Sequence, residues 1–226
     1  LEANRKLTWR DVQHLCVYTS NWKSLIQAGN WTRNYIGLYF HQKFGFGLLD
    51  TAKLIDWARD TSWVTSPPKY ICTSQTQFQV LTSKSEINIY FFVDGCKNTD
   101  REINYVEHTQ ITISVDYSTR RGDIFINIHS PSGTISPILD KRNEDDSTVG
   151  FINWTMTTVH FWGENPKGQW IIKFKDDGGY MTANVGVVKF CTLTIHGTRD
   201  ITAYQLLHSR YQRSTRQEIY SKKTRT

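Results

Sequence analysis

Between residues 66 and 198 the sequence contains a series of short segments in which every second side chain is apolar. A period of two places apolar side chains on one face of an extended strand. The clearest alternating sets are Ile87, Ile89, Phe91 and Val93; Ile111, Ile113, Val115 and Tyr117; Ile124, Ile126 and Ile128; Trp170, Ile172 and Phe174; and Leu193 and Ile195. Turn-forming sequences separate them at residues 121–123, 131–133, 165–166 and 176–179. Short alternating strands joined by turns predict an antiparallel β-sandwich.

The first 60 residues carry a helical pattern instead. Thr8 is a good N-cap, and Asp11 suits the positive end of a helix dipole. The apolar stripe that follows at helical spacing consists of Val12, Leu15, Cys16 and Thr19. A second helix is expected over residues 50–60, after a loop rich in glycine and aromatic residues. Ser66-Pro67-Pro68 then stops any helix and marks a domain boundary.

Charge is concentrated at the C-terminal end of the chain. Residues 199–226 hold seven Lys and Arg against two Asp and Glu, so they supply five of the six net positive charges at pH 7. The basic character therefore reports a tail rather than a binding face, and it gives no support to a nucleic-acid-binding function. We expect residues 199–226 to form a solvated, disordered tail. No apolar run approaches the roughly 18 residues that a membrane span needs, so none is expected in this segment.

The sequence contains no complete active-site motif and no complete metal-binding motif. The chain has no G-x-S-x-G nucleophile turn, no C-x-x-C pair and no phosphate-binding glycine loop. Its seven histidines have no serine and acid nearby in sequence, so a structural role is expected for each. The acidic clusters at residues 143–146 and 176–177 do not match the spacing of a calcium-binding loop, and solvated turns are the simpler interpretation. We assign no metal ligand.

Two motifs allow a functional and a structural interpretation. Arg121-Gly122-Asp123 could bind a cell-adhesion receptor, but it joins two apolar strands, which favours a turn whose charged groups bond locally. The rings of Trp154, His160, Trp162 and Trp170 lie within 17 residues and could stack on a sugar or a base. Large rings supply most of the burial in a sandwich, which favours a core or domain-interface role.

The cysteines and sequons suggest an oxidising compartment. Cys72 and Cys96 lie 24 residues apart and flank two strand-like runs, which suits a disulfide that closes a loop. Cys16 and Cys191 fit small buried positions. Asn30 and Asn153 each begin an Asn-Trp-Thr glycosylation sequon, although such triplets often occur by chance.

Several segments taken together resemble one known family. They are Leu1-Glu2-Ala3-Asn4 with Leu7-Thr8-Trp9-Arg10-Asp11; Tyr39-Phe40-His41 with Gly45-Phe46-Gly47-Leu48-Leu49-Asp50; Cys72 with Cys96; Arg120-Arg121-Gly122-Asp123; Gly150-Phe151; Trp154, His160, Trp162-Gly163-Glu164-Asn165-Pro166, Gly168 and Trp170; and His196-Gly197-Thr198. In this order and spacing they resemble the kexin/furin-like proprotein convertases, over residues 1 to about 198.

The resemblance implies a division of the chain. Residues 1–63 would be the C-terminal end of a subtilisin-like (peptidase S8) α/β catalytic domain, and residues 66–198 the P or Homo B domain, a jelly-roll-like β-sandwich. The family signature in the second part comprises Arg121, Gly122, Asp123, Trp154, His160, Trp162, Gly163, Glu164, Pro166 and Trp170. Residues 199–226 stay outside the resemblance as the basic tail.

The resemblance also implies a function for the protein of which this chain would be a fragment. The family enzymes are calcium-dependent serine endoproteases of the secretory pathway that cut precursor proteins after paired or clustered basic residues. The catalytic triad and calcium ligands of the family precede Leu1, so no catalytic or calcium-binding residue is assigned here. We expect the segment to stabilise the rest of its own catalytic domain, its main partner.

Two alternatives stay open at this point. The chain could be a non-catalytic P-domain module that binds a partner or serves as a scaffold, or it could belong to an inactive pseudoprotease. The two expected helices weigh against a free-standing module, because their apolar stripes would otherwise be left uncovered. The triad of the longer protein would decide between an enzyme and a pseudoprotease.

Overall fold

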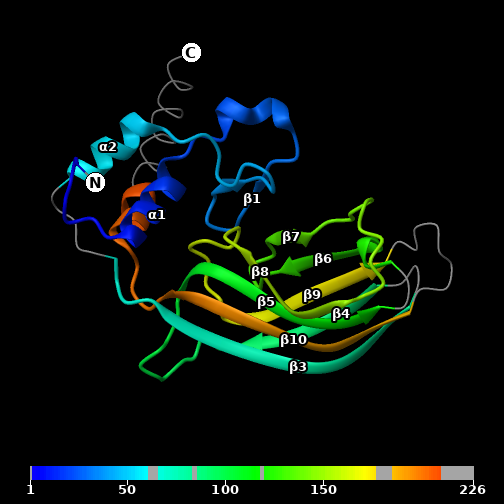
Figure 1. Cartoon of the computed structure of the whole chain (residues 1–226). Helices are drawn as coiled ribbons and strands as arrows, with labels where there is room; N and C mark the ends of the chain where they lie inside the picture. The colour runs from blue at the N-terminus through cyan, green and yellow to red at the C-terminus, as the bar shows by residue number, and fades with distance from the viewer. Residues whose placement is uncertain (1, 61–65, 83–85, 118–119, 177–184, 210–226) are drawn as a thin grey trace, which may run out of the picture. The chain divides into compact units, whose positions relative to one another are not determined.

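Two antiparallel four-stranded sheets dominate the computed structural model, which describes residues 2–60, 66–82, 86–117, 120–176 and 185–209 (Figure 1). The first sheet has the order β3-β10-β5-β8, and the second has the order β4-β9-β6-β7. Their strands are β3 (Tyr70–Thr82), β4 (Glu86–Val93), β5 (Tyr105–Tyr117), β6 (Ile124–His129), β7 (Ile135–Leu139), β8 (Phe151–Thr158), β9 (Gly168–Asp176) and β10 (Val185–Thr198). The predicted β-sandwich is confirmed.

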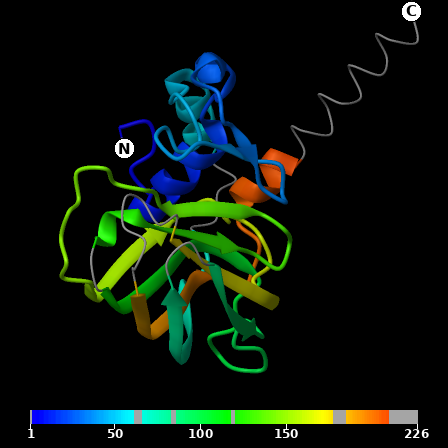
Figure 2. The same cartoon turned by 90° about the vertical axis from the view of Figure 1, so that its right-hand side faces the viewer.

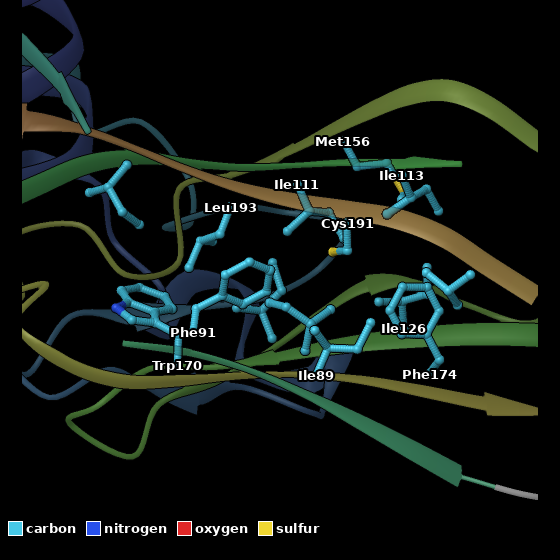
Figure 3. Packing of buried hydrophobic residues seen from close by; sticks show 14 of the residues in the cluster. Ile89, Phe91, Ile111, Ile113, Ile126, Met156, Trp170, Phe174, Cys191 and Leu193 are labelled. Carbon is cyan, nitrogen blue, oxygen red and sulfur yellow. The ribbon is translucent and has the colours of Figure 1, made fainter. Parts of the chain in front are cut away.

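The alternating side chains explain how the two sheets pack. Ile89 and Phe91 of β4 and Trp170 of β9 point from one sheet toward Ile111 of β5 and Leu193 of β10 in the other (Figure 3). All of these side chains are buried. The hydrophobic effect therefore holds the layers together through the period-two faces that the sequence displays.

The N-terminal part contains helices α1 (Trp9–Thr19) and α2 (Thr51–Arg59), a 3₁₀ turn η1 (Lys23–Ala28) and the two-residue strands β1 (Thr32–Arg33) and β2 (Tyr39–Phe40). Thr8 and Asp11 form a capping box at the start of α1, in which the Asp11 amide donates to the Thr8 hydroxyl at 3.2 Å. The Asp50 side chain caps α2 by accepting from the Lys53 amide at 3.0 Å. Both helices were expected from the sequence at these positions.

The chain divides into two compact units. Unit 1 comprises Leu1–Thr32, Leu38–Pro68 and Asp200–Thr226, and unit 2 comprises Arg33–Gly37 and Lys69–Arg199. The division near residue 68 lies close to the expected boundary. The grouping differs from the expected one in two places, because Arg33–Gly37 belong with the sandwich and the residues after Arg199 belong with the helices.

The second difference corrects the prediction of a disordered tail from residue 199. Residues 203–209 are helical, and Tyr204 is 1% exposed. The amide of Gln205 donates to the Thr202 hydroxyl at 3.3 Å, and the Thr202 amide donates to the Gln205 side-chain oxygen at 3.2 Å. This capping box starts the helix. The net charge of residues 199–226, on which the prediction of a disordered tail rested, gives no indication of it. Residues 210–226 lie outside the described residues.

Candidate functional site

A buried carboxylate, Glu164, lies at the centre of the signature segment in unit 2. The residue is 0% exposed. Its Oε1 accepts hydrogen bonds from the Tyr35 amide at 3.0 Å and from the Thr134 hydroxyl, and its Oε2 accepts from the Ser130 hydroxyl at 2.7 Å. Burial raises the pKa of the Glu164 carboxyl, although these three hydrogen bonds oppose the effect by favouring the charged form. We call Glu164 with its three donors the Glu164 site.

A second set of hydrogen bonds holds the residue next to Tyr35. The Asn34 side-chain amide donates to the carbonyl oxygens of His160 and Trp162, both at 3.1 Å. Around it, the Gly163 amide donates to the Val106 carbonyl at 2.7 Å. Residues Arg33–Gly37 are therefore bound into the sandwich through both backbone and side chain, although the chain on either side of them belongs to unit 1.

His160 could suggest a catalytic pair, because its Nδ1 lies 2.7 Å from the Ser136 hydroxyl. Ser136 is fully buried and also lies 3.0 Å from the Thr158 hydroxyl. A serine nucleophile must reach a substrate carbonyl, and this one cannot. The arrangement favours the structural role that the sequence analysis gave to His160.

The Arg121-Gly122-Asp123 triplet forms the short turn η2 (Arg121–Asp123) before β6. Asp123 is fully buried and pairs with Arg120 at 3.0 Å. A Cβ on Gly122 would lie 2.4 Å from the Arg142 carbonyl oxygen, so only glycine fits there. Arg121 pairs with Asp145 at 2.9 Å. An adhesion motif needs an exposed loop tip, and this packing leaves none.

The signature aromatics do not all share one environment. Trp162 and Trp170 are buried, and the Trp170 indole donates to the Pro166 carbonyl at 2.8 Å. Trp154 is 53% exposed, so a core role does not apply to it. Its ring meets the Phe151 ring edge-on at 6.2 Å. Trp154 lies on β8, an edge strand of its sheet.

A disulfide joins Cys72 at the start of β3 to Cys96 in the loop after β4, with 5.8 Å between their Cα atoms. Cys16 is half-buried and Cys191 is buried, and both are free thiols. Among the described residues, one group of three side chains could hold a metal ion, namely Cys72, Asp94 and Cys96. The disulfide occupies both sulfur atoms of that group, so the group is unsuited to a metal.

Replacing both bridged cysteines with serine should lower the free energy of unfolding by about 3 kcal/mol, because the bridge closes a loop of 24 residues in the unfolded chain. Urea unfolding followed by tryptophan fluorescence measures this loss. Cys16→Ser is the matched control, since that thiol is free and half-buried, and it should change stability by less than about 1 kcal/mol. Equal losses in both variants would contradict the prediction.

Both sequon asparagines are exposed. Asn30 follows a glycine turn and has a φ of 54°, and Asn153 has a φ of 46° where β8 shifts register against β5. The Asn153 backbone amide donates a hydrogen bond to the Ser114 hydroxyl at 2.9 Å. Glycosylation at either position stays a prediction.

No helix among the described residues is long and apolar enough to cross a membrane.

Sequence reasoning named Glu164 and His160 but missed their partners. Asn34 and Tyr35 lie about 130 positions away in the chain, and nothing in their local pattern distinguishes them from other loop residues. Ser130 and Thr134 flank the predicted turn at residues 131–133, which was a usable signal for hydroxyl groups at the end of a strand. The Glu164 site thus combines a turn that the sequence predicts with a distant segment that only the folded chain places next to Glu164.

Comparison with known proteins gives a consistent family. The model of the proprotein convertase P-domain matches residues 106–193. Neuroendocrine convertase 2 of Drosophila melanogaster is 41% identical over 214 residues, which cover 92% of this chain and 32% of that protein. The human protein of the same name is 39% identical over 203 residues, covering 88% and 31%. Endoprotease bli-4 of Caenorhabditis elegans is 36% identical over 208 residues, covering 88% and 21%.

The chain thus spans about a third of the length of the first two of these relatives. Among solved structures, the serine protease of Aeromonas sobria matches with a TM-score of 0.60 at 18% identity, over 86% of this chain and 41% of that one. An identity this low shows the fold alone. The sequence resemblance and the fold therefore agree over both the helical part and the sandwich.

Proposed function

Because this chain belongs to the proprotein convertase family and contains its P-domain, we propose that the whole protein is a calcium-dependent serine endoprotease that cuts secreted precursor proteins after paired or clustered basic residues. Residues 1–63 are then the end of a subtilisin-like catalytic domain, and residues 66–198 are the P domain. The segment itself supplies no catalytic residue. Its role is to stabilise the catalytic domain.

The observation that carries this role is the placement of Arg33–Gly37. These residues come from the catalytic part of the chain, yet Glu164 and the carbonyls of His160 and Trp162 bind them into the sandwich. A buried acceptor with three donors holds its partners more firmly than exposed polar contacts do. The P domain therefore fixes the conformation of a catalytic-domain loop, which is a direct way to stabilise that domain.

Unit 1 leaves a surface for the remainder of the catalytic domain. An apolar pocket of about 390 Å³ lies between α1 and α2, with Leu7, Val12, Leu54 and Ile55 among its lining residues. An apolar hollow of this kind is costly in water unless another surface fills it. We propose that a part of the longer protein outside this chain covers it, because the chain spans only 32% of the Drosophila relative.

Calcium would bind elsewhere in the longer protein. Among the described residues, the one group whose side chains could hold a metal ion is Cys72, Asp94 and Cys96. The two cysteines form the disulfide, and calcium prefers oxygen ligands, so this group does not suit calcium. The disulfide and the two exposed sequons support placement in the secretory pathway, because disulfides persist in oxidising compartments.

The proposal is tested with the full-length protein that contains this chain. Secreted protein is assayed on a peptide with Lys-Arg at the cleavage position and on the same peptide with both residues replaced by alanine. We expect cleavage after the basic pair, none of the alanine peptide, and loss of activity when calcium is chelated. A protein with intact disulfides that cleaves neither peptide would overturn the enzyme assignment and leave the scaffold or pseudoprotease.

A further inference from the structure

The helical segment after the P domain is an unexpected element of unit 1. Residues 202–209, which we call the strap, follow β10 and begin with the capping box of Thr202 and Gln205. Thr202, Tyr204 and Gln205 are all buried. In Figure 2 the strap is the orange-red helix beside the blue α1. The burial of three residues within one helical turn is not expected of a solvated tail, so the strap packs against the rest of unit 1.

The strap and α1 meet through two matched pairs of rings. The Tyr204 ring lies parallel to the His14 ring, with 5.4 Å between centroids and 3° between planes. One helical turn further along each helix, the His208 ring meets the Tyr18 ring at 5.2 Å. His14 and Tyr18 of α1 are four residues apart, as are Tyr204 and His208 of the strap, so each helix presents two rings on one face.

The charged groups around these rings favour a neutral His208. Lys53 of α2 faces His208 and is half-buried, and its Nζ lies 3.5 Å from the Tyr18 carbonyl oxygen. Burial and the positive charge of Lys53 lower the pKa of His208 to about 4. The other titratable groups at this contact are His14 and Tyr18 on α1, Tyr204 on the strap itself, and Asp11, which hydrogen-bonds to Tyr204.

We propose that the strap is an acid-released element: it docks on α1 while His208 is neutral, and protonation of His208 beside Lys53 releases it. A free histidine has a pKa near 6.5, so the released strap binds a proton more readily than the docked strap does. Docking is therefore strongest above about pH 6.5 and weakens as the pH falls toward 4. Release uncovers the ring face of α1 formed by His14 and Tyr18.

Hydrogen–deuterium exchange of the full-length protein tests this inference without relying on protease activity. The amide protection of a peptide covering residues 201–209, corrected for the intrinsic pH dependence of exchange, is compared at pH 7 and pH 5. A pKa of about 4 when docked and about 6.5 when free predicts a fall in protection of about 20-fold. Unchanged protection between the two pH values would overturn the proposal.

Two variants separate titration of His208 from loss of packing. His208→Phe keeps a ring against Tyr18 but has no titrating group, so its protection should stay high and no longer change with pH. Lys53→Met removes the facing charge and should reduce the fall seen at pH 5. His129→Gln is the control, because burial also lowers the pKa of His129 but that residue lies on β6, and it should leave the fall unchanged. A fall that persists in His208→Phe would exclude His208 as the switch.

Discussion

Glu164→Ala is expected to lower the free energy of unfolding of the sandwich unit by about 3–4 kcal/mol. The substitution leaves the hydroxyls of Ser130 and Thr134 without their buried acceptor, and it leaves the Tyr35 amide only its second hydrogen bond, to the Thr134 hydroxyl at 3.1 Å. Each buried donor that loses its partner costs about 1–3 kcal/mol, and the two hydroxyls can partly recover by rotating toward other groups. Urea unfolding measures the loss, and exchange of the Tyr35 amide should rise in parallel.

Glu164→Gln is the matched control for this prediction. Glutamine has nearly the same shape and keeps one carbonyl acceptor, so we expect a loss of about 1 kcal/mol. An alanine variant that is as stable as the glutamine variant would contradict the importance of the three donors. It would also remove the main support for the role of the P domain in holding Arg33–Gly37.

The unmodified protein and the Glu164→Gln variant differ in the expected pH dependence of their stability. Because burial raises the pKa of Glu164, the folded state holds its proton at a pH where the unfolded chain has released it. Stability from this group is therefore greatest on the acid side and falls as the pH rises through the raised pKa. Glu164→Gln has no such proton and should lack this component. The strap has the opposite sign, since acid weakens its docking.

The sequence was sufficient for the fold because the decisive signal is local. Ile87, Ile89, Phe91 and Val93 alternate within one strand, and the structure buries Ile89, Phe91 and Val93 in the core. A period-two pattern needs no knowledge of distant residues to place a strand face. The capping box at Thr8 was equally local, and it starts α1 as expected.

The Glu164 site was less accessible to such reasoning. Glutamate is seldom fully buried, so a turn that contains Glu164 suggests a solvated position. Its acceptor role depends on Tyr35, which lies 129 positions away in the sequence and which no local pattern links to Glu164. The strap was missed for another reason: the net charge of residues 199–226 dominated the interpretation, while Thr202 and Gln205 already carried a helix-start signal.

Trp170→Ala should be among the most damaging single substitutions in the sandwich, with an expected loss of about 4 kcal/mol. The residue is 0% exposed, and its ring meets the Phe161 ring edge-on at 4.9 Å. In the adjacent strand Phe91 is its register partner, and both side chains point into the core (Figure 3). Alanine would leave a large cavity and would remove the donor to the Pro166 carbonyl.

Trp154→Ala is the matched control, because it deletes the same side chain at a position that is 53% exposed. It should cost less than about 1 kcal/mol, and it retains the sequon at Asn153. Chemical unfolding of the two variants side by side isolates the effect of burial from the effect of losing an indole. If both variants lost the same free energy of unfolding, the buried and the exposed tryptophan would contribute equally to stability. The hydrophobic core between the sheets could then no longer be taken as the main stabilising feature of the P domain.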